Sequence, residues 1–196
     1  MNGKLILVYF STETCTGRSK ARATPKCGQH QSVEEPRNHL DTGKQVTHGS
    51  DWFTNAMSDL VAYVDGGSLG NPGSSGIGVV IDGSANGTIK IAKWIGHQDN
   101  NVAEYLALLE ALQCALGLKA RALHVFSDSE VVVRQMRGEY NCRSPRLYSL
   151  HWICRKLAGS LDFSISHVRR EHNTVANGLA SSAARNRRAT ANVYPG

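Results

Sequence analysis

The chain has 196 residues, enough for one well-buried domain of about 100–150 residues and an appendage. It carries 22 Lys and Arg against 16 Asp and Glu, and the formal net charge of +6 suits a polyanionic partner without identifying one. No apolar run approaches the roughly 18 residues of a membrane span, and the apolar core of residues 5–10 is too short for a signal peptide. The five cysteines show no tight pairing, which favours a reducing compartment, so we expect a cytoplasmic protein without a membrane partner.

Residues 1–58 differ in composition from the rest of the chain. The apolar run at 5–10 is followed by a polar segment with almost no apolar periodicity before Trp52 and Phe53. Such a composition cannot bury enough surface to offset the entropy lost on ordering it. We therefore expect residues 1–58 to form an N-terminal extension, of low order or docked on the domain, and not a second domain.

Two more specific interpretations of this extension are open. Residues 5–17 resemble the first strand and phosphate loop of flavodoxins, but residues 18–50 do not supply the alternating strands and helices of that fold. Metal binding is the other interpretation, and only Cys27 and His30 have the spacing of a ligand pair. The remaining candidate ligands have no second member at a comparable distance: Cys15, His39 and His48.

Compact alternation of apolar and polar residues begins at Leu60 and predicts three strands. They cover residues 60–65, 76–81 and about 88–95. The turn-forming residues 82–87 join the second and third strands as a hairpin. The first three strands are therefore expected to form an antiparallel meander.

Helices and strands alternate after residue 99. Apolar residues recur at three- and four-residue spacing in the first helix, which begins after Asn100 and Asn101. The predicted elements are a helix to about Leu116, a strand at 123–126, a helix ending near Gly138, a helix at 145–158, a strand at 161–168 and a helix at 173–187, followed by a polar tail at 188–196. This order predicts an α/β domain over 59–187, with a five-stranded mixed sheet flanked by helices.

Three acidic residues stand at positions that this topology brings together. Asp65 ends the first strand before a turn rich in Gly, Asp128 ends the fourth strand, and Glu104 lies in the first turn of the long helix. Each has an ordinary alternative role, as a solvated turn residue, an N-cap and an acid at a helix N-terminus respectively. Together they can surround a divalent cation, because hard cations prefer oxygen ligands.

The motifs around these acids resemble those of type 1 ribonuclease H. The resemblance covers about residues 60–187 and rests on Asp65–Gly73, Asn100–Tyr105 and Phe126–Ser129, in the family's order and spacing. Three further segments are similar to the short branch of the family, which lacks the basic protrusion between the middle helices: 138–140, 144–147 and 167–173. The resemblance implies a ribonuclease H-like three-layer fold. Nothing in the sequence suggests obligate oligomerisation, so we expect a monomer.

The activity implied by this resemblance is endonucleolytic hydrolysis of the RNA strand of RNA–DNA hybrids, leaving 5′-phosphate and 3′-hydroxyl ends. Two Mg²⁺ or Mn²⁺ ions would be held in the presence of substrate. The resemblance places the metal ligands at Asp65, Glu104, Asp128 and Asn177.

Asn177 departs from the family pattern. The family motif at the start of the last helix reads Asn-x-x-Ala-Asp-x-Leu-Ala, whereas residues 173–180 read Asn-Thr-Val-Ala-Asn-Gly-Leu-Ala. An amide keeps a neutral oxygen that can coordinate a metal but lacks the carboxylate charge. We therefore expect an Asp-Glu-Asp-Asn site with weaker metal affinity on this side, favouring Mn²⁺. An alternative is a relative that binds hybrids with weak or no catalysis, and a third is an integrase- or resolvase-like nuclease, which the Gly-rich turn disfavours.

Further site residues follow from the same resemblance. Arg170 and His172 are candidates for the residue that assists proton transfer or product release; a plain surface His is the alternative for His172. RNA is distinguished from DNA by its 2′-hydroxyl across a wide, shallow minor groove, which backbone groups and short polar side chains can contact. The candidate hybrid-binding positions are Gly67, Ser68, Asn71, Asn100, Asn101 and Glu130.

Overall fold

The computed structural model describes residues 58–194. The flavodoxin-like run, the pair Cys27 and His30, and the extension up to residue 57 lie outside the described residues. None of the helices within 58–194 is long and apolar enough to span a membrane.

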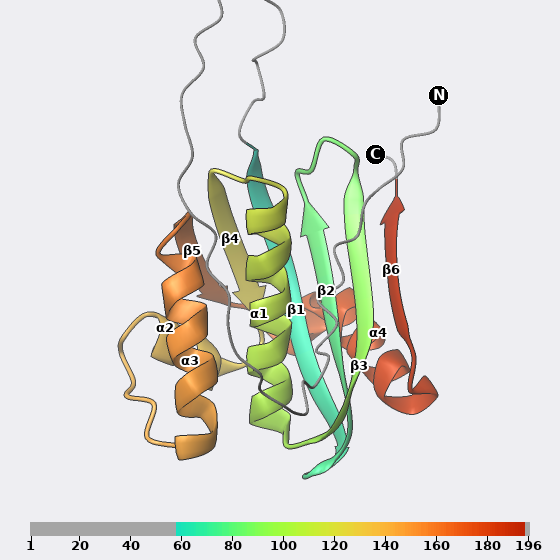
Figure 1. Cartoon of the computed structure of the whole chain (residues 1–196). Helices are drawn as coiled ribbons and strands as arrows, with labels where there is room; N and C mark the ends of the chain where they lie inside the picture. The colour runs from blue at the N-terminus through green and yellow to red at the C-terminus, as the bar shows by residue number, and fades with distance from the viewer. Residues whose placement is uncertain (1–57, 195–196) are drawn as a thin grey trace, which may run out of the picture. The chain divides into compact units, whose positions relative to one another are not determined.

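The described chain is built on one six-stranded mixed sheet (Figure 1). Across the sheet the order is β5-β4-β1-β2-β3-β6. β1 pairs in parallel with β4, and β4 with β5, whereas β2, β3 and β6 continue the sheet in antiparallel fashion on the other side. The strands are β1 Asp59–Gly70, β2 Gly73–Asp82, β3 Thr88–Gln98, β4 Ala122–Ser127, β5 Asp162–His167 and β6 Ala189–Tyr194.

Helices cover both faces of this sheet and make the three-layer fold that the sequence predicts. α1 and α3 lie on the face turned to the viewer, and α4 lies behind the sheet (Figure 1). Their bounds are α1 Asn100–Gly117, α2 Glu130–Met136, α3 Pro145–Ala158 and α4 Thr174–Asn186, with a short 3-10 helix, η1, at Arg170–His172. Residues 137–144 connect α2 to α3 without any further helix.

The sheet has six strands where the sequence analysis expected five, so the expected strand count was wrong. Arg187 is the C-cap of α4; it adopts a left-handed backbone conformation (φ 51°) and turns the chain back toward the sheet. Residues 189–194, expected to belong to a polar tail, then pair antiparallel with the outer edge of β3. An edge strand packs against one neighbour only, so it can form without the apolar pattern by which strands are predicted.

The first helix is capped one residue earlier than expected. Asp99 is its N-cap, and the Asp99 side chain accepts a hydrogen bond from the Val102 backbone N–H at 2.9 Å. Asn100 and Asn101 therefore lie in the first turn, and neither supplies the cap.

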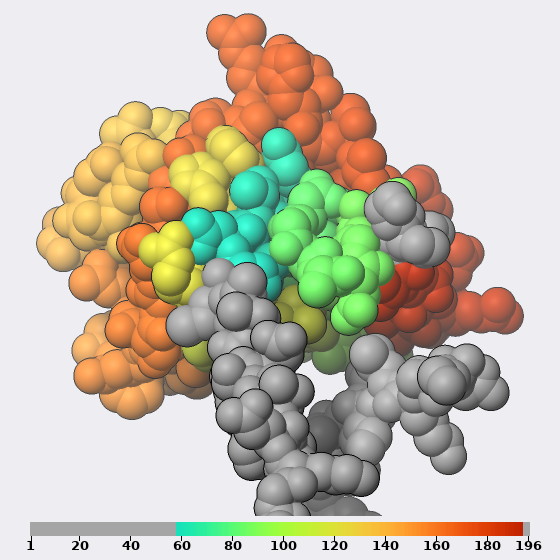
Figure 2. Space-filling view, turned by 90° about the horizontal axis from the view of Figure 1, so that it is seen from above, coloured from blue at the N-terminus to red at the C-terminus, as the bar shows by residue number. Residues whose placement is uncertain are grey.

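The core lies where the central strands meet α1. The alternate residues Leu60, Ala62 and Val64 of β1 are all buried, and the fully buried Tyr105 and Leu108 of α1 belong to the same cluster. In the space-filling view along the sheet, β1 and the β2–β3 pair lie in the middle, with the later segments around them (Figure 2). A side chain in the middle of β1 therefore has a paired strand on each side, β4 and β2.

Candidate active site

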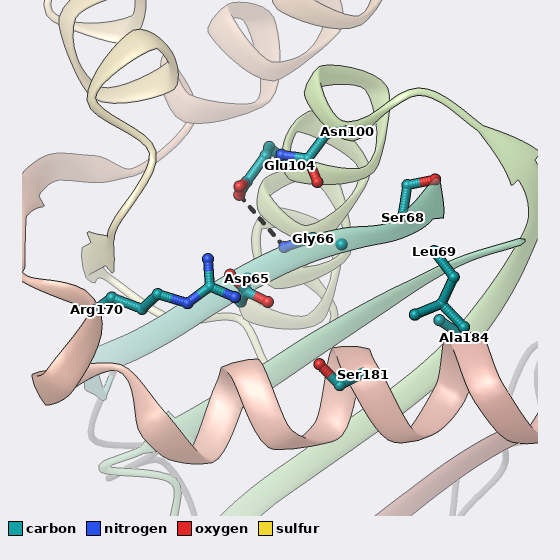
Figure 3. Close-up of a pocket in the computed structure, with 10 residues that line it drawn as sticks. Asp65, Gly66, Ser68, Leu69, Asn100, Glu104, Arg170, Ser181 and Ala184 are labelled. Carbon is teal, nitrogen blue, oxygen red and sulfur yellow. Dashed lines mark hydrogen bonds between the residues drawn. The ribbon is translucent and has the colours of Figure 1, made fainter. Parts of the chain in front are cut away.

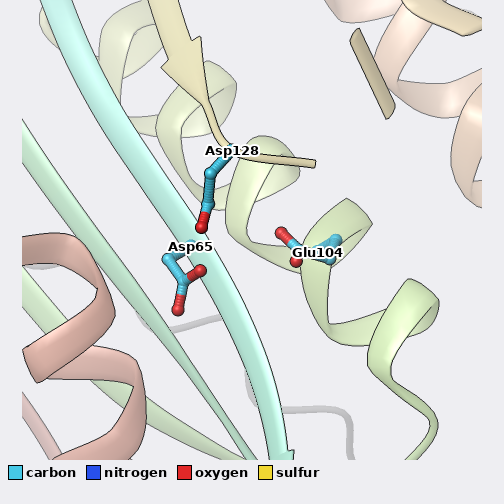
Figure 4. A group of neighbouring side chains, drawn as sticks. All are labelled: Asp65, Glu104 and Asp128. Atoms are coloured by element: carbon cyan, nitrogen blue, oxygen red, sulfur yellow. The ribbon is translucent and has the colours of Figure 1, made fainter. Parts of the chain in front are cut away.

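Three carboxylates converge where β4 ends beside the middle of β1 (Figure 4). Asp65 lies on β1, Asp128 follows β4, and Glu104 comes from the first turns of α1. One oxygen from each lies within 4.8 Å of the others. Because β1 and β4 are parallel neighbours, with Val64 opposite Ser127, Asp128 follows the end of β4 beside Asp65. The expectation that Asp65 ends the first strand was wrong: residues 66–70 stay paired with β2, so β1 runs on to Gly70 and Asp65 lies in mid-strand. The structure thus brings together the three acids that the sequence analysis selected.

Glu104 reaches the cluster because α1 packs unusually close to β1. A Cβ atom on Gly66 would lie 2.1 Å from the backbone carbon of Ala103, so only glycine fits at this position. At this short separation the Gly66 N–H donates a hydrogen bond to Glu104 Oε2 at 3.3 Å (Figure 3). The glycine that follows Asp65 therefore orients the second carboxylate.

Burial and mutual repulsion raise the pKa values of two acids of the cluster, Asp65 and Glu104. Asp65 is 3% exposed, and its burial, together with the charge and hydrogen bonding of Asp128, raises its pKa to about 7. Burial likewise raises the pKa of Glu104 well above its usual value, with further contributions from the charges of Asp65 and Asp128. The positive charge of Arg170 and, for Glu104, the hydrogen bond from Gly66 act in the opposite direction. Concentrated negative charge of this kind favours a bound cation.

Asn173 connects the cluster to the sheet, a role that the sequence analysis did not foresee. Its side chain is 1% exposed and its Nδ2 donates to the Val64 carbonyl at 2.9 Å and to Asp128 Oδ1 at 3.0 Å. Asn173 stands at the N-cap of α4, but its side chain makes no capping hydrogen bond. An Asn before a helix predicts a cap, so only its burial reveals the different partners. The capping alternative for Asp128 is also not observed, since Ser129 is the N-cap of α2.

Arg170 and Asn177 contact each other beside the cluster. With its amide oriented to satisfy both groups, the Asn177 oxygen accepts hydrogen bonds from Arg170 Nη2 at 2.5 Å and from Arg170 Nε at 2.9 Å. Figure 3 shows the Arg170 side chain extending toward Asp65. His172 lies at the other end of η1 and is exposed. The ligand role predicted for Asn177 and the roles predicted for Arg170 and His172 stay predictions.

A hollow of about 320 Å³ opens beside the carboxylates (Figure 3). Of the predicted hybrid-binding residues, Gly67, Ser68 and Asn100 line it. Asn71 adjoins them, because its Oδ1 accepts a hydrogen bond from the Asn100 N–H at 3.1 Å. Arg170 also lines the hollow, as do Ser181 and Ala184 of α4, which the sequence analysis did not single out.

The other two predicted hybrid-binding residues stand apart from the hollow. Asn101 follows Asn100 on α1 and is exposed. Glu130 begins α2, where it forms an ion pair with Arg134 one turn later, at 2.5 Å. The structure therefore brings Gly67, Ser68, Asn71 and Asn100 together, and leaves Asn101 and Glu130 outside that group.

Comparison with known proteins identifies the family of this domain. A family model described as "Reverse transcriptase-like" matches residues 63–183, which is more than half of the chain. A ribonuclease HI of Halobacterium salinarum is 36% identical over 124 residues, 62% of this chain and 62% of that protein. A bifunctional protein of Mycobacterium tuberculosis is 37% identical over 127 residues, 63% of this chain but 35% of that protein. The chain therefore spans about a third of the length of this mycobacterial relative.

Two solved structures have the same fold. RNase H1 from Halobacterium salinarum matches with a TM-score of 0.62 and 34% identity, over 65% of this chain and 98% of that one. LC11-RNase H1, solved in complex with an RNA/DNA hybrid, matches with a TM-score of 0.61 and 33% identity, over 66% of this chain and 99% of that one. The motif order, the three-layer fold and these matches agree, and the chain belongs to the type 1 ribonuclease H family.

Proposed function

We propose that this chain is an endoribonuclease that hydrolyses the RNA strand of RNA–DNA hybrids. The observation that carries the proposal is the triad Asp65, Glu104 and Asp128, with oxygens within 4.8 Å of one another at the edge of a hollow, in a member of this family. A relative of known structure was solved with such a hybrid bound, which supports the same substrate here. Hydrolysis would leave 5′-phosphate and 3′-hydroxyl ends.

The triad is suited to divalent metal ions. Its donors are all oxygens, and two of the three carboxyl groups are buried. Burial and then the charges of the neighbouring carboxylates raise the pKa values of these two groups, and a bound cation would compensate both effects. When bound, two Mg²⁺ or Mn²⁺ ions would lower the pKa of the attacking water and stabilise the leaving 3′-oxygen during in-line displacement. Asp65, Glu104 and Asp128 would hold them. Near neutral pH, a cation must compete with a proton on Asp65, so metal binding should strengthen as the pH rises.

Recognition of RNA fits the groups that line the hollow. Gly67 presents backbone without a side chain, and no atom lies within 4 Å of where its Cβ would be, so a ribose can approach closely. Asn100 and Ser68 supply polar groups beside it. A 2′-hydroxyl both donates and accepts hydrogen bonds, so this mixture of groups can select for it in the shallow minor groove.

Asn177 supports a second candidate function, a protein that binds hybrids but cleaves them slowly or not at all. A neutral amide stands where the family has a carboxylate, and the site therefore carries one negative charge fewer with which to attract metal ions.

The test is cleavage of a labelled RNA–DNA hybrid in Mg²⁺ or Mn²⁺, beside the matching DNA duplex. We expect cleavage of the RNA strand only, and a loss of at least about 1,000-fold in kcat/KM for Asp65→Asn and for Glu104→Gln, because each removes a metal-binding charge. Binding without cleavage at every metal concentration would establish the second candidate. Cleavage of the DNA duplex would overturn the choice of substrate.

A further inference from the structure

We propose that Asn177 is a positioning residue for Arg170 and not a ligand of a metal ion. Arg170, held in this way, presents its remaining N–H groups to a phosphate of the bound nucleic acid. The inference rests on the proposed nuclease function only for the identity of that nucleic acid. The contact between the two side chains stands independently of it.

The hydrogen bonds of Asn177 leave its oxygen no capacity for a metal ion. An amide oxygen has two lone pairs, and here both accept from Arg170, one from Nε and one from Nη2. A carboxylate at the same position would have about four acceptor sites and could bind a guanidinium and a cation together. The change from carboxylate to amide therefore removes the ligand function and keeps the contact with arginine.

Besides the attraction of Asp65 and Glu104, Arg170 has little to restrain it in its own backbone segment. It belongs to η1, a helix of three residues, and it is exposed to solvent. An unrestrained arginine side chain loses rotamer entropy when it is fixed. Asn177 lies on α4, which packs on the sheet with Ala176 and Ala180 fully buried. The rigid helix thus holds the guanidinium through Asn177.

The direction of the held guanidinium indicates what it can bind. Arg170 lines the hollow together with Gly67, Ser68 and Asn100, and it extends toward Asp65 (Figure 3). A guanidinium has five N–H groups, and Asn177 uses two of them. The other three can bind a phosphate group that enters the hollow beside the carboxylates, where arginine is the best-matched side chain.

A double-mutant cycle of Asn177→Ala, Arg170→Ala and the double variant tests the proposal without requiring cleavage. Calorimetry measures Mn²⁺ binding to the free protein, and fluorescence anisotropy measures hybrid binding in Ca²⁺. We expect Asn177→Ala to keep the Kd for Mn²⁺ within about twofold and to weaken hybrid binding by up to about 10-fold. The double variant should bind hybrid no more weakly than Arg170→Ala alone, because both changes remove the same interaction. Asn186→Ala, which loses an Asn side chain from the same helix, is the matched control and should change neither affinity.

The opposite results would overturn the inference. A Kd for Mn²⁺ that rises about 10-fold or more in Asn177→Ala would show that Asn177 is a metal ligand. Losses of hybrid affinity that multiply in the double variant would show that Asn177 and Arg170 act separately. If the wild-type protein binds no hybrid, the proposed function fails, and the Mn²⁺ titrations still decide whether Asn177 is a ligand.

Discussion

Asn173 shows how one buried amide can organise a charged site. A single NH₂ group joins the backbone of β1, next to Asp65, to the carboxylate of Asp128, which follows the neighbouring strand β4. The Asn173 oxygen is buried and accepts no hydrogen bond within the described residues. A buried polar group costs free energy unless it is paired. The two hydrogen bonds of Nδ2 fix the Asp128 carboxylate relative to β1.

Asn173→Ala is expected to weaken Mn²⁺ binding by about 10-fold or more, because Asp128 loses the donor that orients it. Stability should also fall, by about 1–3 kcal/mol, since the Val64 carbonyl is left buried without this partner. Calorimetric titration and urea unfolding measure the two effects. Gln135→Ala is the control: it removes a buried amide that accepts from the Tyr105 hydroxyl at 2.6 Å, away from the carboxylates. An equal loss of Mn²⁺ affinity in both variants would refute the positioning role of Asn173.

The helices hold the site because glycines let them approach the sheet. Gly66 admits the backbone of α1 on one face, as described above. On the other face a Cβ on Gly78 of β2 would lie 2.0 Å from the carbonyl oxygen of Ala176 in α4. The helix that carries Asn177 therefore rests directly on the strand next to β1, and its height above the sheet is set by a residue with no side chain.

Gly78→Ala is expected to force α4 away from the sheet. The obstacle is rigid backbone, so we expect a loss of stability of about 3 kcal/mol or more together with weaker hybrid binding. Gly178→Ala provides the contrast, because Gly178 lies in α4 with nothing within 4 Å of its Cβ position. That change should stabilise the helix by roughly 0.5–1 kcal/mol. Thermal unfolding of both variants checks the pair, and equal effects would show that the close approach at Gly78 carries no cost.

At the scale of the whole molecule, ionisation of the buried carboxylate cluster destabilises the folded state. Burial and the charge of Asp128 raise the pKa of Asp65 to about 7, from its ordinary value of 3.8. The folded protein therefore binds a proton between these pH values that the unfolded chain has already released. In the metal-free protein, the protonated Asp65 therefore contributes its full stabilisation of the folded state below about pH 4. This contribution is lost as the pH rises toward 7.

Asp65→Asn should remove this pH dependence in the metal-free protein. Relative to wild type, the variant is expected to gain stability as the pH rises from about 4 to 7, by up to about 4 kcal/mol, and to gain no more above that range. Urea unfolding in EDTA at several pH values measures the difference. Adding Mn²⁺ at pH 8 should stabilise the wild type more than the variant, because Asp65 no longer offers its charge. If the difference in the free energy of unfolding between the two proteins stays constant with pH, the raised pKa of Asp65 is not the origin of the pH dependence.

Patterns within short segments were sufficient to identify the family, the class of fold and the three acids. Strand periodicity and the motifs around each acid depend on neighbouring residues, so Asp65, Glu104 and Asp128 could be named from the sequence. The end of the first strand could not, because the pairing of residues 66–70 with β2 carries β1 on to Gly70. The order of parallel and antiparallel strands followed from the same segments, and the three-layer fold is confirmed. The match of residues 63–183 to the family confirms the resemblance that these motifs carried.

Contacts between distant segments were decided only by the tertiary structure. β6 forms because the turn at Arg187 places residues 189–194 against a free strand edge, and their own composition does not encode that edge. The packing of α4, η1 and β1 decides which groups bond to the Asn173 NH₂ group and to the Asn177 oxygen. An amide can cap a helix, bind a metal or hold a guanidinium with equal chemical ease. Which of these it does depends on the atoms that packing brings within about 3 Å of it.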